Sequence, residues 1–181
     1  EFLYPGCGYG GSCLPKDINA LINTSKKNNY FPKLLNAVNE VNNKQKLILF
    51  DKLKKYYKGK LKNKKIAIWG LAFKPNTDDT RFAPSLEIIE ALIKAGSEIT
   101  AYDPIATLAK TFSKKSSKYR EVASAKLALK NADALIICTE WKEFWSIDPK
   151  AFVDVMVEPL IFDGRNIYSP EIMKKNNILY F

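Results

Sequence analysis

Histidine is absent from this 181-residue sequence, and cysteine occurs only three times, as Cys7, Cys13 and Cys138. A structural zinc site needs four nitrogen or sulfur ligands, and a disulfide framework needs an even number of suitably spaced cysteines. The sequence offers neither, so we expect no metal site and no disulfide scaffold. The remaining question is which of the three thiols has a chemical role.

Long apolar runs are missing as well. No stretch approaches the roughly 20 uninterrupted apolar residues that span a bilayer, and no basic segment followed by an apolar one opens the chain. We therefore expect a cytoplasmic protein with no membrane partner. With 46% hydrophobic residues, the chain is long enough to bury one core of ordinary size and to carry an appendage.

Arginine is absent from the first 65 residues, although the entire net charge of +10 comes from this part of the chain. The densest basic segment, KLKKYYKGKLKNKK at residues 52–65, combines lysines with two tyrosines. Such a segment either binds nucleic acid or is a solvated helix end and linker. The lack of arginine, the usual residue for bidentate phosphate and base contacts, favours the linker, so we expect no nucleic-acid partner.

Residues 1–60 are predicted to form a loop followed by helices. Ile18, Leu21 and Ile22 repeat at helical spacing after Pro15, and Pro32 opens a longer amphipathic pattern that continues to residue 57. A helix of this length outside a compact core packs against a partner or spans two domains of one subunit. We expect a homodimer formed through residues 32–57.

Residues 61–181 alternate between short apolar runs and helical patterns. Strands are predicted in 64–70, 97–104, 132–139, 158–164 and 178–181, and helices in 83–96, 105–112, 124–132, 140–156 and 169–177. This alternation predicts an α/β fold with a Rossmann-like, doubly wound parallel sheet, preceded by the long helix. Ligands of such sheets bind at the carboxyl ends of the strands, which directs attention to the loops after Trp69, Tyr102, Thr139 and Phe162.

The loop after the first strand, WGLAFKPNTDDTR, contains only Gly70 where a dinucleotide-binding strand would be followed by G-x-G-x-x-G. It offers Lys74, a cation suited to phosphate, and Arg81 just before the next helix. Arg165 follows the strand and turn IFDG and is predicted to reach the same edge. One hypothesis is that Lys74 and Arg165 form an anion site. The alternative is that the loop is a helix cap and that Arg165 pairs with a nearby acid.

Half of the eight glycines lie in PGCGYGGSCLPKD at residues 5–17. Glycines leave backbone amides free to wrap an anion such as a pyrophosphate. Cys13 precedes a predicted helix, and Lys16 follows it; both features favour a thiolate, so Cys13 is a better nucleophile candidate than Cys7 inside the loop. Asp17 is close enough to act as a base. The alternative is an inert buried cysteine, as we expect for Cys138.

The motifs GCGYGGSCLPKD, WGLAFKPNTDDTRFAPSLEIIEALIKAGSEITAYDP, TEWKEF and FDGRNIY together resemble the UDP-glucose/GDP-mannose dehydrogenase family, and the last two are most similar to its UDP-glucose 6-dehydrogenases. The motifs occur in the family's order and span nearly the whole chain. The resemblance implies an NAD-dependent enzyme that oxidises UDP-glucose twice at C6 to give UDP-glucuronate. UDP-N-acetylmannosamine and GDP-mannose dehydrogenases are the related alternatives.

The resemblance also implies roles for particular residues. Cys13 would form the thiohemiacetal and thioester, with Asp17 activating water and Lys16 near the thiolate. The substrate would be bound by Tyr4, Pro5, Gly6, Cys7, Gly8, Tyr9, Gly10, Phe73, Lys74 and Arg165. NAD would contact Cys13, Leu14, Pro15, Lys16 and Arg81.

Nothing in the sequence matches the N-terminal NAD-binding domain of that family. We therefore expect residues 1–60 to hold the cysteine loop and the dimer helices, and residues 61–181 to form the UDP-sugar-binding domain. On this hypothesis the chain is a C-terminal portion that binds a UDP sugar weakly and does not turn over alone. A nucleic-acid-binding module and a dimerisation scaffold without activity are the competing hypotheses.

Overall fold

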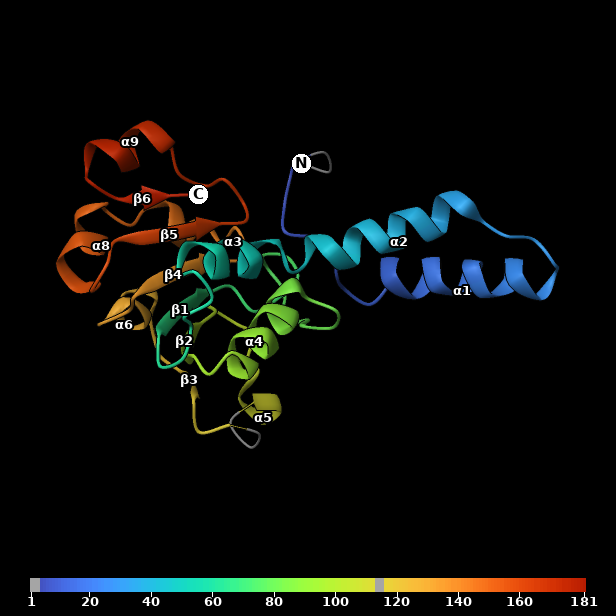
Figure 1. Ribbon diagram of the computed structural model, residues 1–181, viewed down its shortest axis with the longest axis horizontal. Helices are drawn as coiled ribbons and strands as arrows, with labels where there is room; N and C mark the ends of the chain where they lie inside the picture. Colours follow the sequence, from blue (N-terminus) through green and yellow to red (C-terminus); the bar gives the residue numbers. More distant parts are fainter. Residues whose placement is uncertain (1–3, 113–115) are drawn as a thin grey trace.

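The computed structural model describes residues 4–112 and 116–181 (Figure 1). Helices α1 (Leu14–Lys27) and α2 (Lys33–Gln45) lie side by side and project as an arm from an α/β domain (Figure 1). Pro15 near the start of α1 and Pro32 just before α2 suit helix N-termini, because proline lacks the amide that is unpaired there.

The domain is built on a six-stranded parallel sheet with the order β3-β2-β1-β4-β5-β6. Its strands are β1 (Lys65–Trp69), β2 (Glu98–Tyr102), β3 (Tyr119–Glu121), β4 (Ala134–Ile137), β5 (Leu160–Asp163) and β6 (Leu179–Tyr180). This order confirms the predicted Rossmann-like doubly wound sheet. Strand β3 was not predicted from the sequence, because a three-residue strand with one buried side chain leaves almost no periodic signal.

The register brings the functional loops together at one edge of the sheet. Trp69, at the end of β1, lies opposite Tyr102 of β2 and Ile137 of β4, while Ile137 lies opposite Asp163 of β5. Four strands therefore end at the same level. The segments that follow them must meet there.

Helices cover both faces of the sheet. On one face, α3 (Ile48–Tyr56) and α4 (Pro84–Lys94) pack against Ile66, Ile68 and Phe162. On the other face, α6 (Ala125–Leu129) and neighbouring helices enclose Trp69. The Trp69 ring stacks on the Phe144 ring, with the two ring centres 4.9 Å apart. The remaining helices are α5 (Ala109–Phe112), α7 (Lys142–Trp145), α8 (Lys150–Val155) and α9 (Pro170–Lys175). The helix predicted over 140–156 is thus two short helices.

The single helix predicted over residues 32–57 is also wrong, because α2 and α3 are separate. At the junction Leu47 N donates to Lys44 O at 3.1 Å, a bond three residues back that tightens the turn and ends α2. Leu49 and Leu53 of α3 then enter the domain's own core. These two side chains are therefore not free to form a partner surface.

Within the described ranges, no helix combines the length and apolar character needed to cross a membrane.

Candidate functional site

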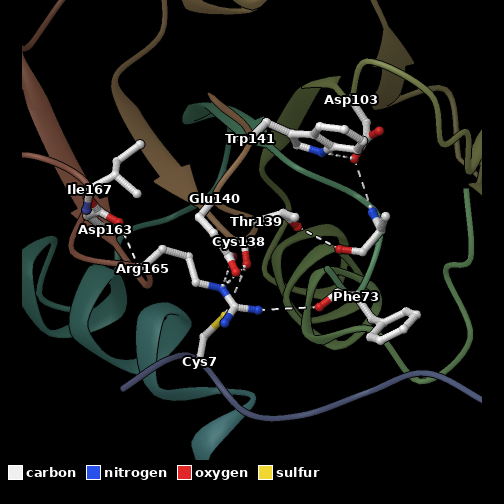
Figure 2. Close-up of polar contacts among 11 residues, drawn as sticks. Cys7, Phe73, Asp103, Cys138, Thr139, Glu140, Trp141, Asp163, Arg165 and Ile167 are labelled. Atoms are coloured by element: carbon white, nitrogen blue, oxygen red, sulfur yellow. Dashed lines mark hydrogen bonds and ion pairs between the residues drawn. The ribbon is translucent and has the colours of Figure 1, made fainter. Parts of the chain in front are cut away.

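Arg165 lies at the meeting point of the loops that follow β1, β4 and β5 (Figure 2). Its Nε donates to Cys138 O at 2.8 Å, and its Nη2 donates to Phe73 O at 3.3 Å. Glu140 Oε2 lies 3.0 Å from Nε. Because the single Nε–H is directed at Cys138, this carboxylate contributes charge rather than a hydrogen bond. The structure thus brings Arg165 to the Phe73–Lys74 loop, and also gives it an acidic neighbour.

Asp163 and Gly164 set the position of Arg165. The buried Asp163 carboxylate accepts Arg165 N at 2.8 Å, Ile167 N at 2.9 Å and the Tyr180 hydroxyl at 2.7 Å. A Cβ atom at Gly164 would lie 2.9 Å from the backbone oxygen of Ile137 and 2.8 Å from Leu49 Cδ1, so a side chain there would clash with the backbone. This turn therefore fixes the backbone from which Arg165 extends.

Asp103 directly follows β2, and its side chain binds the backbone of the loop after β1. Its Oδ2 accepts the amides of Leu71 and Ala72 at 2.7 and 3.1 Å and Trp141 Nε1 at 3.0 Å (Figure 2). In a dinucleotide-binding fold, amides of this loop would face the pyrophosphate. Here a side chain already bonds them, which agrees with the missing glycine fingerprint. Asp103 was not among the predicted site residues, although an acid at a strand end was the available signal.

Phe73 and Lys74 border the glycine-rich segment. Lys74 is exposed, with Nζ 5.4 Å from the centre of the Phe73 ring. A Cβ atom at Gly11 would lie 2.8 Å from that ring, at Cε2. Phe73 therefore packs on the segment, while the Lys74 ammonium stays in solvent.

Helix α2 holds the same segment from the other side. Asn42 Oδ1 accepts Tyr9 N at 2.8 Å, Asn42 Nδ2 donates to Tyr9 O at 3.1 Å, and Gln45 Nε2 donates to Gly6 O at 2.7 Å. Asn42 and Gln45 lie three residues apart on one helix face. Neither residue was predicted from the sequence. The Tyr9 amide, expected to face an anion, is used within the protein.

Close packing accounts for several of the glycines. A Cβ atom at Gly6 would lie 2.6 Å from Arg165 Nη1, and one at Gly10 would lie 2.4 Å from Phe82 O. These glycines let the segment pass between Arg165 and the start of α4. We predicted that they free the backbone for a ligand; at Gly10 the neighbour is another stretch of backbone.

Lys46 is a buried cation that sequence analysis overlooked. The residue is 5% exposed, and its Nζ lies 5.9 Å from the centre of the Phe82 ring. It packs against Gly8, where an added Cβ atom would lie 3.0 Å from Lys46 Cγ. Burial lowers the pKa of Lys46, and the charge of Glu87 opposes that shift in part. The end of α2 therefore places a positive charge beneath the glycine-rich segment.

The three cysteines have different surroundings. Cys7 is buried and its Sγ donates to Cys138 O at 3.5 Å, while the Cys7 thiol and burial raise the pKa of Cys138. Cys13 is exposed at the N-cap of α1, with Ser12 Oγ 3.7 Å from its Sγ. The structure therefore leaves Cys13 as the accessible thiol.

The first turn of α1 carries the other predicted catalytic side chains. Lys16 Nζ lies 3.5 Å from Asp17 Oδ1, both side chains are mostly exposed, and Asp17 N donates to Cys13 O at 2.9 Å. Leu14 is exposed and Pro15 is buried. Apart from Pro15, these side chains are therefore open to solvent.

Arg81 connects this turn with the loop after β1. Its guanidinium is bidentate on Asp79, at 2.9 and 2.8 Å, and this pairing raises the pKa of Arg81. Arg81 O accepts Gly11 N at 2.7 Å. The predicted residues therefore form two groups joined by Gly10 and Gly11: the edge with Phe73, Lys74 and Arg165, and the exposed turn with Cys13.

No group of three or more His, Cys, Asp or Glu residues is arranged to hold a metal ion in residues 4–112 and 116–181.

Two family models match this chain. Residues 67–170 match the UDP binding domain of the UDP-glucose/GDP-mannose dehydrogenase family, and residues 1–44 match the central domain of the same family. A UDP-glucose 6-dehydrogenase from Pseudomonas aeruginosa is 42% identical over 189 aligned positions, covering 99% of this chain and 41% of that protein. One from Bacillus subtilis is 44% identical, covering 93% and 38%.

Solved structures show the same similarity. A UDP-glucose dehydrogenase from the hyperthermophilic archaeon Pyrobaculum islandicum superposes with a TM-score of 0.80 at 28% identity, covering 97% of this chain and 38% of that one. A UDP-D-ManNAc dehydrogenase from Pyrococcus horikoshii gives 0.74 at 29% identity, covering 92% and 37%. The present chain spans about two fifths of the length of these relatives. The matched domains show that this chain belongs to the UDP-glucose/GDP-mannose dehydrogenase family.

Proposed function

We propose that this chain is the UDP-sugar-binding portion of an NAD-dependent dehydrogenase that oxidises UDP-glucose at C6, in two steps, to UDP-glucuronate. The observation that supports this most directly is the path of residues 4–17. This one segment packs on Arg165 through Gly6 and carries the exposed Cys13 at its far end. An anion-binding edge and an accessible thiol are thereby linked by a few residues.

The anionic diphosphate of the substrate would lie at the edge with Arg165 and Lys74. Arg165 presents a guanidinium that the turn at Asp163 holds in place, and Lys74 adds a mobile ammonium. Phe73 and the backbone of residues 4–10 would complete the site, with the buried side chain of Cys7 acting only in packing. Glu140 reduces the positive charge of Arg165 and so moderates the affinity.

Cys13 would perform the covalent chemistry. After C6 has been oxidised to the aldehyde, the Cys13 thiolate attacks that carbon and forms a thiohemiacetal, which the second oxidation converts to a thioester. Asp17 would activate the water that hydrolyses the thioester, releasing the carboxylate and the free thiol. Lys16, one residue before Asp17, would keep the thiolate and the carboxylate near a positive charge.

NAD, when bound, supplies the hydride acceptor for both oxidations. The exposed turn fits it, because Cys13, Leu14 and Lys16 are open to solvent and Arg81 adds a cation at the same place. Pro15 would shape the backbone there. The main dinucleotide contacts are assigned to a domain outside these 181 residues, since Asp103 bonds the amides that a Rossmann pyrophosphate would use.

A homodimer would form through the arm. Large apolar side chains on α1, α2 and their connection are exposed, including Leu21, Tyr30, Phe31, Leu34 and Val41. Charged variants at Leu34 and Val41, which are 76% and 64% exposed, test this: light scattering should report a dimer for the wild-type chain and a monomer for Leu34→Lys/Val41→Lys. A monomeric wild type would refute the arm interface.

The anion site is tested by calorimetric titration of the chain with UDP. Lys74→Ala and Arg165→Met should each weaken binding about tenfold or more, since 1.4 kcal/mol corresponds to a factor of ten. Lys110→Ala, at an exposed position on α5, is the control and should bind as the wild type does. Unchanged affinity for UDP in both site variants would show that UDP does not bind at this edge.

The role of Cys13 is tested by alkylation in the presence of the 6-aldehyde of UDP-glucose. Iodoacetamide should label Cys13 faster than the buried Cys7 and Cys138, and the aldehyde should slow that labelling by occupying Sγ. UDP-glucose itself, which has no aldehyde, is the matched control ligand. Equal protection by both compounds would mean that the sugar shields Cys13 without bonding to it.

A further inference from the structure

An open hollow of about 390 Å³ lies at the amino ends of β1, β2 and β3, away from the UDP edge. Lys65 and Glu98, the first residues of β1 and β2, line it, together with Lys130 after α6. Figure 1 shows α6 on the side of the domain opposite the arm. Arg165, in contrast, follows the carboxyl end of β5. The two regions are therefore at opposite ends of the strands.

The short α6 helix explains why the hollow exists. Its Ala128 and Leu129 pack with Ala67 and Trp69, the later residues of β1, and Ala125 O accepts Trp69 Nε1 at 3.0 Å. With only five residues, α6 covers that part of the sheet face, whereas Lys65 and Glu98 at the starts of β1 and β2 remain exposed. A concave polar surface remains over the sheet.

Four cations surround this hollow: Lys65, Lys118, Arg120 and Lys130. Glu98 is the acidic residue of its lining. Among residues 4–112 and 116–181, no carboxylate lies within 4.0 Å of the side-chain nitrogens of these four. The neighbouring Asp133 pairs instead with Lys64, at 2.8 Å and outside the lining. The lining therefore carries four cations against one acid, and Asp133, which also accepts Lys65 N, lies beside it.

Two of the cations are held in position by the backbone and by a hydroxyl. Lys118 Nζ donates to Gly96 O at 2.8 Å, and Arg120 Nε donates to Thr100 Oγ1 at 3.0 Å. Each of these contacts uses one donor. The remaining ammonium protons of Lys118 and the two terminal amino groups of the Arg120 guanidinium can therefore donate to a ligand. Positioned donors lose less conformational entropy on binding than free side chains do.

We propose that this hollow binds a small polyphosphate anion, at a site separate from the UDP edge. The four cations offer only donors, so the ligand must be rich in acceptors and multiply negative, and the volume is that of a small-molecule site. A guanidinium suits phosphate oxygens because its donors lie in one plane at matching spacing. Cations around a hollow also suit a compact anion better than the extended backbone of a nucleic acid.

The test is calorimetric titration of the chain with inorganic tripolyphosphate at low ionic strength. One equivalent should bind, and Arg120→Gln/Lys130→Gln should weaken binding at least about 20-fold. The matched control is Lys52→Gln/Lys55→Gln, which removes the same charge from exposed positions of α3 and should change the affinity less than about twofold. Equal losses in both double variants would show diffuse charge attraction and overturn the proposal.

Two further measurements separate the alternatives. Lys74→Ala and saturating UDP should leave tripolyphosphate binding intact; competition by UDP would place the anion at the UDP edge and overturn the proposal, whatever the outcome for UDP itself. Citrate, a carboxylate trianion, should bind at least about tenfold more weakly, and equal binding would overturn the assignment to phosphate. Circular dichroism melts of the Arg120→Gln/Lys130→Gln variant confirm that it is folded.

Discussion

Replacement of Arg165 by methionine should reduce both the stability of the domain and its affinity for UDP, and the structure allows these effects to be separated. The variant loses the bonds to Cys138 O and Phe73 O and leaves Glu140 without a cation. The Arg165 and Glu140 side chains are 16% and 34% exposed, so water screens part of the loss. We expect a cost of about 2–3 kcal/mol in the free energy of unfolding.

This cost corresponds to a fall in melting temperature of about 4–12 °C for a chain of this size. On the proposed function, the variant also loses a charge-assisted contact of about 2 kcal/mol with the diphosphate, so UDP should bind about 30-fold more weakly. Both quantities can be measured on one sample, by calorimetric melting and by titration.

The double variant Glu140→Gln/Arg165→Met separates the two roles. With no unpaired carboxylate left, it should recover about 1 kcal/mol of stability relative to Arg165→Met. Its UDP affinity should remain low, because the cation is still missing. Glu140→Gln alone should bind UDP up to about fivefold more tightly. If the double variant regained wild-type UDP affinity, Arg165 would have no direct role in anion binding.

Three further predictions concern the surroundings of the site. Gly10→Ala should cost about 2–3 kcal/mol, because its Cβ would clash with the backbone oxygen of Phe82. Gly59→Ala meets nothing within 4 Å and should cost only about 1 kcal/mol of backbone strain, so urea melts showing equal losses would contradict the steric argument. Lys46→Met should stabilise the chain by about 1 kcal/mol at pH 7. Burial lowers the pKa of Lys46, so the desolvation cost is present below the folded pKa and vanishes as the pH rises to the ordinary value of 10.5; a stability difference independent of pH would refute this cause. Asp103→Asn should cost about 3 kcal/mol, since an amide cannot accept all of the bonds from Leu71, Ala72, Ile105, Ala106 and Trp141; a melting temperature within 2 °C of wild type would count against it.

Much of the fold follows from local patterns in the sequence. Apolar runs such as those ending at Trp69 and Ile137, alternating with helical segments, predict a parallel sheet because helices must cross over between parallel strands. The carboxyl edge then follows as the ligand edge, so Lys74 and Arg165 were predicted to meet there. The three-residue β3 and the break between α2 and α3 escaped this reasoning, because their causes lie in packing rather than in periodicity.

The site depends more strongly on contacts between distant residues. The fold brings together residues that are far apart in the sequence: Asn42 with Tyr9, Asp103 with Leu71 and Trp141, and Glu140 with Arg165. Hydrogen-bond partners more than about 20 residues apart carry no periodic signal in a single sequence.

The sequence by itself determined the alternation of strands and helices, the edge at which we expect ligands to bind and the candidacy of Cys13 as the nucleophile, because these depend on residue type and on near neighbours along the chain. Only the tertiary structure decided that Cys7 is buried beside Cys138, that Gly10 is required by the backbone of Phe82, and that four cations surround a hollow at the far end of the strands. Those outcomes depend on which surfaces the short α6 helix and the break before α3 leave covered or open, and such distances are set by packing in three dimensions.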